Sequence, residues 1–141
     1  MDARLDAFAA LSDLSKLGKK TKEVEIGEAK TKILLSTMDS EQEGNVFIAC
    51  GDLNGNAYFF RLKAETLKYA IKAVNGKRLD EYENIKEADK REKLKAETLI
   101  ELTKILNSWD ENVISFLYGK WTELAKESED DLKSKGIQAA E

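Results

Sequence analysis

The chain has 141 residues, of which 42% are hydrophobic, and this length and composition fit one domain around a single core. Its 27 acidic and 23 basic residues give a formal charge of −4, so the chain attracts phosphate backbones weakly and nucleic acid is not expected as a partner. The absence of histidine and proline removes the usual proton shuttle near neutral pH, the commonest transition-metal ligand and the strongest helix breaker.

The first residues predict a short amphipathic helix that forms an N-terminal arm. The pattern lies between residues 3 and 17, after Asp2 as a cap and before Gly18 as a stop. Its apolar members near helical spacing are Leu5, Phe8, Leu11 and Leu14. The acidic residues and the lack of an unbroken apolar run predict neither a secretory signal nor a membrane span. We expect residues 1–18 to be the arm and the basic residues 19–23 to be a hinge.

A small β-hairpin is expected next, near residues 23–35. Val24 and Ile26 alternate with acidic residues, and a glycine follows them as a turn. Ile33 and Leu35 then supply a second apolar pair. Alternation of this kind is typical of strands with one buried face.

A capping box predicts the helix that follows the hairpin. Ser40 and Glu43 have the required spacing, and Val46, Phe47 and Cys50 recur on the side expected to be buried. Cys50 is the only cysteine and has no partner for an internal disulfide. Its apolar neighbours indicate a buried thiol in a reducing compartment, so we expect synthesis in a cytosol.

Two long helical patterns follow the loop at residues 51–56. The first covers residues 57–74 and ends at Asn75-Gly76. Its apolar face is expected to hold Phe60, Ala64, Leu67, Ala70, Ile71 and Val74. The second covers residues 82–108, with a charged first half and then the stripe Leu99, Leu102, Leu106 and Trp109.

A last helix is predicted to begin near Asp110 and to give way to a polar tail at residues 127–141. Its apolar members are Val113, Phe116, Leu117, Trp121 and Leu124. The expected fold is therefore mainly α: four to five helices with a minor β-hairpin. Residues 19–126 would form the core domain.

No pattern of residues predicts an enzyme or a bound cofactor or metal. The loop at residues 52–56 begins like a calcium-binding loop, but Ala57 stands where glycine is required and Lys63 where the closing glutamate belongs. The carboxylate pairs Glu97/Glu101 and Glu127/Asp130 lie among lysines, as on a solvated helix face. Phosphate loops and one-sided basic patches are also missing. We therefore expect a non-enzymatic protein.

The aromatic residues are the candidates for a protein interface. Three consecutive aromatic residues at 58–60 cannot all face one core from a helix, and the last helix spreads its aromatics around more than one stripe. Exposed aromatic side chains are the usual anchors of interfaces, although a small domain also uses them in its own core. The candidates are Tyr58, Phe59, Trp109, Tyr118 and Trp121.

The segment Leu-Lys-Ala-Glu-Thr-Leu occurs twice, at residues 62–67 and 94–99. It indicates either a two-copy helical repeat or a coincidence of helix-favouring residues. The segments between the copies differ, and helical repeats normally need at least three units.

Three stretches resemble small tail-assembly proteins of tailed bacteriophages. They are Ile33-Leu34-Leu35-Ser36-Thr37 before an acidic helix start, residues 62–76 up to Asn75-Gly76, and residues 109–124 with Leu117-Tyr118 and Trp121. Together they span residues 33–124, about two thirds of the chain. The chain departs from the family in its separate N-terminal arm and in lacking a proline after Trp109.

The resemblance implies a role in tail or baseplate assembly, as a chaperone for the long tape-measure protein. The alternatives are a permanent structural part of the virion tail, baseplate or neck, and a small phage regulator that binds a host protein. The implied location is the host cytoplasm, or the virion if the protein stays in the particle. An apolar helix face is compatible with a homo-oligomer or with a partner's helix. Nucleic acid and membrane are not expected partners.

Overall fold

A computed structural model gives the fold, and it describes residues 2–137. The helices are α1 (Ala3–Asp13), α2 (Ser40–Cys50), α3 (Gly55–Ala70), α4 (Ala88–Asn107) and α5 (Glu111–Ser134), with 3-10 turns η1 (Leu14–Lys16) and η2 (Glu81–Asn84). The strands are β1 (Thr21–Ile26), β2 (Thr31–Ser36), β3 (Ile71–Val74) and β4 (Lys77–Arg78). The expected mainly helical class is confirmed, but the minor hairpin belongs to a larger sheet.

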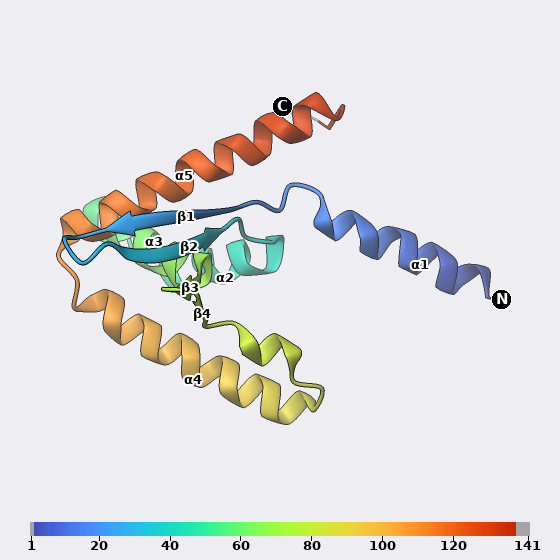
Figure 1. The fold of residues 1–141 in the computed structure, drawn as a ribbon, viewed down its shortest axis with the longest axis horizontal. Coiled ribbons are helices and arrows are strands. Elements are labelled where there is room, and N and C mark those ends of the chain that lie inside the picture. Colours follow the sequence, from blue (N-terminus) through green and yellow to red (C-terminus); the bar gives the residue numbers. More distant parts are fainter. Residues whose placement is uncertain (1, 138–141) are drawn as a thin grey trace.

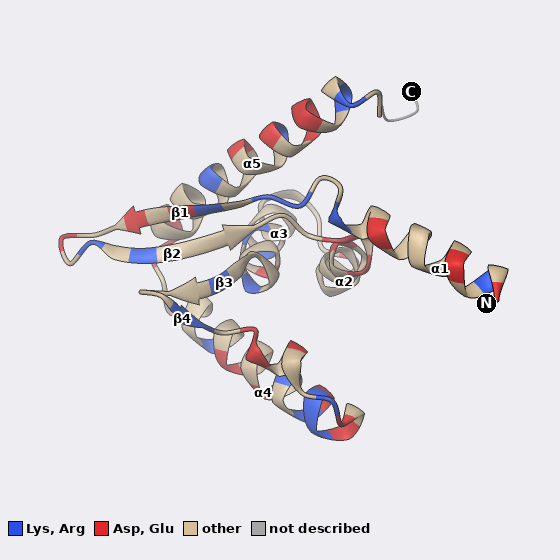
Figure 2. Ribbon diagram, turned by 45° about the vertical axis from the view of Figure 1, so that its right-hand side comes forward, with Lys and Arg blue, Asp and Glu red and all other residues tan. Residues whose placement is uncertain are grey.

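The sheet is antiparallel with strand order β1-β2-β3-β4. In Figure 1, α2 and α3 lie behind it, α5 runs alongside β1, and α4 lies on the β4 side. α1 projects away from this body in both ribbon views (Figures 1 and 2). The expected hairpin near residues 23–35 is confirmed by β1 and β2, which pair from Thr21↔Ser36 to Ile26↔Thr31. The expected hinge is not a separate linker, because β1 already begins at Thr21.

The helix predicted over residues 57–74 is wrong in its last turn. α3 ends at Ala70, and Ile71–Val74 forms β3, which pairs with β2. Ile71 and Ala73 are buried, and the residues between and after them are half-buried, as on a strand with one covered face. Asn75 and Gly76 both have positive φ, of 52° and 79°, so they turn β3 into β4 rather than cap a helix.

The predicted capping box of α2 is displaced by one residue. Asp39 is the N-cap: its Oδ1 accepts from the Gln42 backbone N–H at 2.8 Å, and Gln42 Oε1 accepts from the Asp39 N–H at 3.2 Å. Val46 and Cys50 are buried as expected. Phe47 is 58% exposed, so its expected burial is wrong. The same correction applies to Phe60, which is 52% exposed near the start of α3.

One core joins the sheet to three helices. Its buried members are Val24, Ile33, Leu35, Leu67, Ala70, Ile71, Leu106, Ile114, Leu117 and Leu124. They come from β1, β2, α3, β3, α4 and α5, and Trp109 and Trp121 pack against them as half-buried side chains. α5 begins at the predicted cap, since Asp110 Oδ1 accepts from the Asn112 N–H at 2.8 Å.

α5 continues well past the expected start of the polar tail and ends at Ser134. Ser128, inside the predicted tail, is buried and donates its hydroxyl to the Gly18 carbonyl. Thr37 Oγ1 donates to the same carbonyl at 3.3 Å and accepts from the Lys20 N–H at 3.1 Å. These contacts fix the foot of the arm against α5 and the end of β2. We call them the Gly18 latch.

Alanine at Gly18 is expected to lower the free energy of unfolding by about 2 kcal/mol. Gly18 has a φ of +78°, and an added Cβ would lie 3.0 Å from Leu132 Cδ1. Gly27→Ala is the matched control: its φ is +80° but nothing lies within 4 Å of its added Cβ, so it reports backbone strain alone. Urea unfolding of both variants tests this, and equal losses would show that packing of Gly18 on α5 contributes nothing.

The two Leu-Lys-Ala-Glu-Thr-Leu copies have different surroundings. In the first copy Glu65, Thr66 and Leu67 are buried, and Lys68 Nζ lies 2.6 Å from Glu65 Oε2 as an ion pair without the alignment of a hydrogen bond. In the second copy Glu97 is exposed on α4. The first copy leads into a strand and the second continues a helix, so the copies do not occupy equivalent places in the fold.

Candidate protein-binding surface

Tyr58 and Phe59 lie near the start of α3, where the helix emerges from the turn that follows α2. Phe59 is 56% exposed, and Tyr58 is half-buried. Their rings meet edge to face with centroids 5.7 Å apart. This pair therefore presents one exposed ring supported by a second, partly covered one.

Tyr118 and Trp121 lie one turn apart on α5, with ring centroids 5.8 Å apart. Both line a cleft of about 130 Å³ between α2, α3 and α5, together with Met38, Val46, Phe47 and Leu62. Burial raises the pKa of the Tyr118 hydroxyl, with a smaller contribution from Tyr58. Two of the five candidate residues, Tyr118 and Trp121, thus line one cleft.

Trp121 also has a structural role. Its indole Nε1 donates to the Ser36 carbonyl at 3.1 Å, which ties α5 to the end of β2. The ring packs against the core cluster. Trp121 is therefore part of the wall of the cleft and not a freely exposed anchor.

Trp109 lies apart from the other candidates. It lines an apolar cavity of about 460 Å³ at the connection between α4 and α5, beside the β1–β2 turn. Ile26, Ile33 and Val113 are its apolar neighbours there. The structure does not bring Trp109 together with Tyr118.

The largest group of exposed apolar side chains on the body contains one candidate from the sequence, Phe59, and four residues that sequence reasoning did not propose. We define the α2–α3 set as Phe47, Ile48, Leu53, Phe59 and Phe60. All five are between 41 and 78% exposed on two helices and the short turn that joins them. Phe47 and Phe60 were expected in the core because they fit helical spacing. Exposed apolar groups of this kind mark interaction sites.

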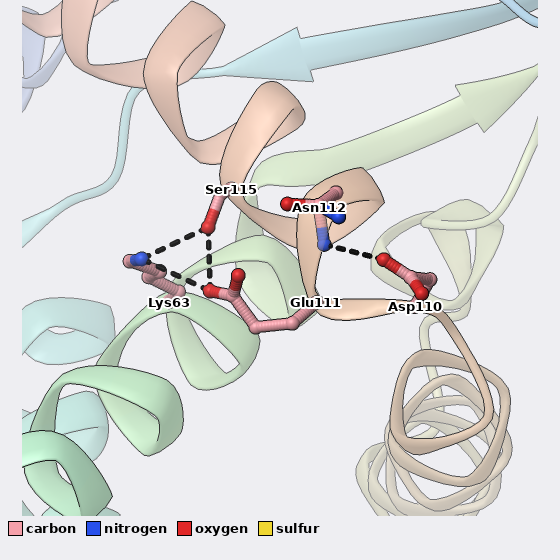
Figure 3. Close-up of polar contacts among 5 residues, drawn as sticks. All are labelled: Lys63, Asp110, Glu111, Asn112 and Ser115. Carbon is pink, nitrogen blue, oxygen red and sulfur yellow. Dashed lines mark hydrogen bonds and ion pairs between the residues drawn. The ribbon is translucent and has the colours of Figure 1, made fainter.

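Lys63, Glu111 and Ser115 form the polar cluster shown in Figure 3. Lys63 Nζ donates to Ser115 Oγ at 2.9 Å and to Glu111 Oε1 at 3.2 Å, and Ser115 Oγ donates to Glu111 Oε1 at 2.6 Å. A lysine beside a serine is one arrangement that activates a nucleophile. Here the serine hydroxyl donates to a carboxylate instead, so the cluster ties α3 to the first turn of α5.

Replacing Ser115 with alanine is expected to raise the pKa of Glu111 toward its ordinary value. The hydrogen bond from Ser115 is the main cause of the lowered pKa of this carboxyl, and the Lys63 hydrogen bond adds to it. Because the folded pKa is lowered, the carboxylate stabilises the fold above its unfolded pKa and loses this effect as pH falls through the folded pKa. Ser115→Ala should therefore reduce the stability that the Glu111 carboxylate contributes and that is lost as the pH falls.

Carboxyl-carbon NMR titration measures this pKa directly. Thr122→Ala is the control, since its hydroxyl donates to the Gly119 carbonyl on the same helix and does not contact Glu111. An unchanged Glu111 pKa in Ser115→Ala would contradict the assigned cause.

The loop after α2 and Cys50, which the sequence analysis also considered, show no arrangement for binding a metal or for catalysis. Residues 51–54 form the turn between α2 and α3. Within residues 2–137 no three potential Cys or carboxylate ligands are grouped to hold a metal ion. Cys50 is 1% exposed, and burial raises the pKa of its thiol, with the charge of Glu65 adding to the shift. The thiol is therefore poorly suited to act as a nucleophile at neutral pH.

Among the described helices, none combines the length and apolarity that crossing a bilayer requires. Comparison of the chain with protein-family models, with curated proteins and with solved structures gave no match.

Proposed function

We propose that the chain is a non-enzymatic protein-binding module of phage tail or baseplate assembly. In this role it acts as a chaperone for a long helical partner such as the tape-measure protein. The phage assignment derives from the three stretches of the sequence that resemble small tail-assembly proteins. The binding role derives from the exposed apolar side chains on the body.

The α2–α3 set is the observation that supports the binding role most strongly. Phe59 is 56% and Ile48 is 78% exposed. A helix that binds no partner normally carries polar residues at positions as exposed as these. The adjoining cleft, which Phe47 also lines, adds Tyr118. An amphipathic helix of a partner binds such a surface by placing apolar side chains at intervals of one turn into the cleft.

The electrostatics also favour a protein partner over a nucleic acid. Figure 2 shows both basic and acidic residues along α4 and α5. Ion pairs such as Lys133–Glu129 at 3.2 Å and Lys120–Glu123 at 3.8 Å neutralise charges along α5. We therefore expect the apolar side chains of the α2–α3 set, and not charged groups, to make most of the contacts with a partner.

Affinity capture from a phage-producing culture tests the proposal. The tagged protein is isolated from the assembly lysate and sought in purified particles, and its partners are identified by mass spectrometry. We expect a tape-measure protein as partner in the lysate and no tagged protein in the particles. Phe59→Ala and Tyr118→Ala should each weaken capture by about tenfold or more, the effect of losing an interface anchor.

Ile100→Ala is the matched control, because Ile100 is 57% exposed on α4, away from the α2–α3 set. It should leave capture unchanged. Stoichiometric retention in particles would instead assign a permanent structural role, and a host protein as the sole partner would assign a regulator. Unaltered capture by Phe59→Ala and Tyr118→Ala, with native circular dichroism, would remove this surface from the proposal.

A further inference from the structure

The segment that carries the α2–α3 set is acidic. Residues 33–60 contain four acidic residues and no lysine or arginine. Two of the four lie in the first turn of α2, whose acidic start is visible in Figure 2. All four are exposed, and within the described part of the chain none of them takes part in an ion pair: Asp39, Glu41, Glu43 and Asp52.

The three basic residues of α3, in contrast, are paired with carboxylates of the same chain. Arg61 Nη1 lies 3.9 Å from Glu65 Oε1, and Lys68 Nζ lies 2.6 Å from Glu65 Oε2. Lys63 Nζ lies 3.2 Å from Glu111 Oε1. These cations are therefore largely neutralised, while the carboxylates of α2 are not. The α2–α3 set is flanked by a surface of negative charge, which attracts a basic partner.

The cleft beside the α2–α3 set combines an apolar wall with one carboxylate. Glu43 is the only charged residue of its lining, and Phe47 follows Glu43 by one helical turn, so both lie on the same side of α2. The cleft volume of about 130 Å³ is below the roughly 300–1,000 Å³ of small-molecule sites. The cleft therefore has room for a side chain and not for a metabolite. The rest of its lining is Met38, Val46, Leu62, Thr66, Tyr118 and Trp121.

We propose that this cleft binds a lysine or arginine side chain of the partner helix, with its aliphatic stem against Phe47 and Tyr118 and its cationic end beside Glu43. The inference rests on the proposed binding role and adds the chemistry of one partner residue. Lysine and arginine pack their methylene groups against apolar surface and keep the charged end in water. Aromatic rings such as those of Phe47 and Tyr118 also attract a cation.

Other side chains fit the cleft less well. An apolar side chain would take water from the Glu43 carboxylate without replacing it, and an acidic side chain would add a like charge. Glu43 also stabilises α2 itself, because a carboxylate in the first turn of a helix interacts favourably with the helix dipole. That structural role affects unfolding and not the choice between two ligands. The test therefore measures a preference.

Fluorescence anisotropy with two labelled model peptides measures this preference. Each peptide is an acetylated and amidated helix of about 18 residues, made of alanine, glutamine and leucine, with the leucines at helical spacing. One central residue of the leucine face is lysine in the first peptide and glutamate in the second. We expect the native chain to bind the lysine peptide about tenfold more tightly than the glutamate peptide.

Glu43→Lys should reverse this preference, and Glu43→Gln should lower it without reversing it. Glu97→Lys is the matched control, because Glu97 is also exposed but lies on α4, and the variant has the same net charge as Glu43→Lys. It should keep the preference for lysine. Circular dichroism confirms that each variant is folded.

A native chain that shows no preference or binds neither peptide would overturn the proposal. The same holds if Glu43→Lys still prefers lysine, or if Glu97→Lys loses the preference to the same extent. Equal binding of both peptides that Phe59→Ala weakens would leave the helix-binding role in place and remove only the basic side chain. A lysine preference that depends on Glu43 would support the inference even if capture found no tape-measure protein.

Discussion

Leu117→Ala is expected to lower the free energy of unfolding by about 3 kcal/mol. Leu117 is fully buried on α5 and belongs to the core cluster that includes Leu67 of α3 and Leu35 of β2. Removing its side chain loses the transfer free energy of three carbon atoms and leaves a cavity between helices and sheet. This loss is a large fraction of the free energy of unfolding of a typical domain, which is roughly 5–15 kcal/mol.

Phe116→Ala is the matched control for this prediction. Phe116 precedes Leu117 on the same helix and is 45% exposed, so we expect a change of only about 0.5 kcal/mol. Guanidinium unfolding followed by circular dichroism measures both. Similar losses for the two variants would mean that α5 does not face the core as described.

Trp121→Ala is expected to lower the free energy of unfolding by about 3 kcal/mol as well. The indole packs against the core, and its Nε1 donates to the Ser36 carbonyl at 3.1 Å. Truncation removes the ring and leaves the carbonyl at the end of β2 without this donor. Trp121→Phe keeps most of the packing and loses the hydrogen bond, so it should cost about 1 kcal/mol.

Thermal and urea unfolding of the two Trp121 variants separate packing from hydrogen bonding. Tyr118→Ala, one turn away, should lose less, because Tyr118 makes no hydrogen bond among the described residues and is only half-buried. If Trp121→Ala were as stable as the native protein, Trp121 would be an interface anchor without a structural role. Because Trp121 also stabilises the fold, Tyr118 and Phe59 are better positions than Trp121 for testing partner binding.

Most of the helical part of the fold could be predicted from local sequence patterns. The Asp2 and Asp110 caps are in place, and the cap of α2 lies one residue from its predicted position. Strong spacing of apolar residues located α3, α4 and α5 because local hydrogen bonds and one covered face determine a helix. The helix predicted over residues 82–108 is wrong in its first part, because η2 covers Glu81–Asn84 and α4 begins only at Ala88. The hairpin of β1 and β2 was likewise visible as alternation.

The third and fourth strands were missed because pairing across the chain outweighed local spacing. Ile71 and Val74 fit the helical face of residues 57–70, but they pair with Leu35 and Ile33 of β2. The usable signal was Asn75-Gly76, which more often closes a hairpin than ends a helix when β-branched residues precede it. A helical interpretation that treats this pair only as a cap extends α3 by one turn too many.

The candidate surface was only partly predictable. Three consecutive aromatics implied that at least one was exposed, and Phe59 and Phe60 both are. The spacing could not show that Phe47 lies outside the core, since that depends on how α2 packs against α3. The spacing also could not show that residues 127–134 continue α5, because this segment is polar. Its contribution to the Gly18 latch comes from a contact with a residue 110 positions earlier in the chain.

Amide hydrogen exchange of the chain, free and bound to its captured partner, tests the central claim most directly. The claim is that the protein works by binding another protein through the α2–α3 set and the adjoining cleft. It predicts slower exchange on binding in α2, at the start of α3 and around Tyr118, with α4 unchanged. Protection confined to α4, or no protection anywhere in a stable complex, would contradict the claim.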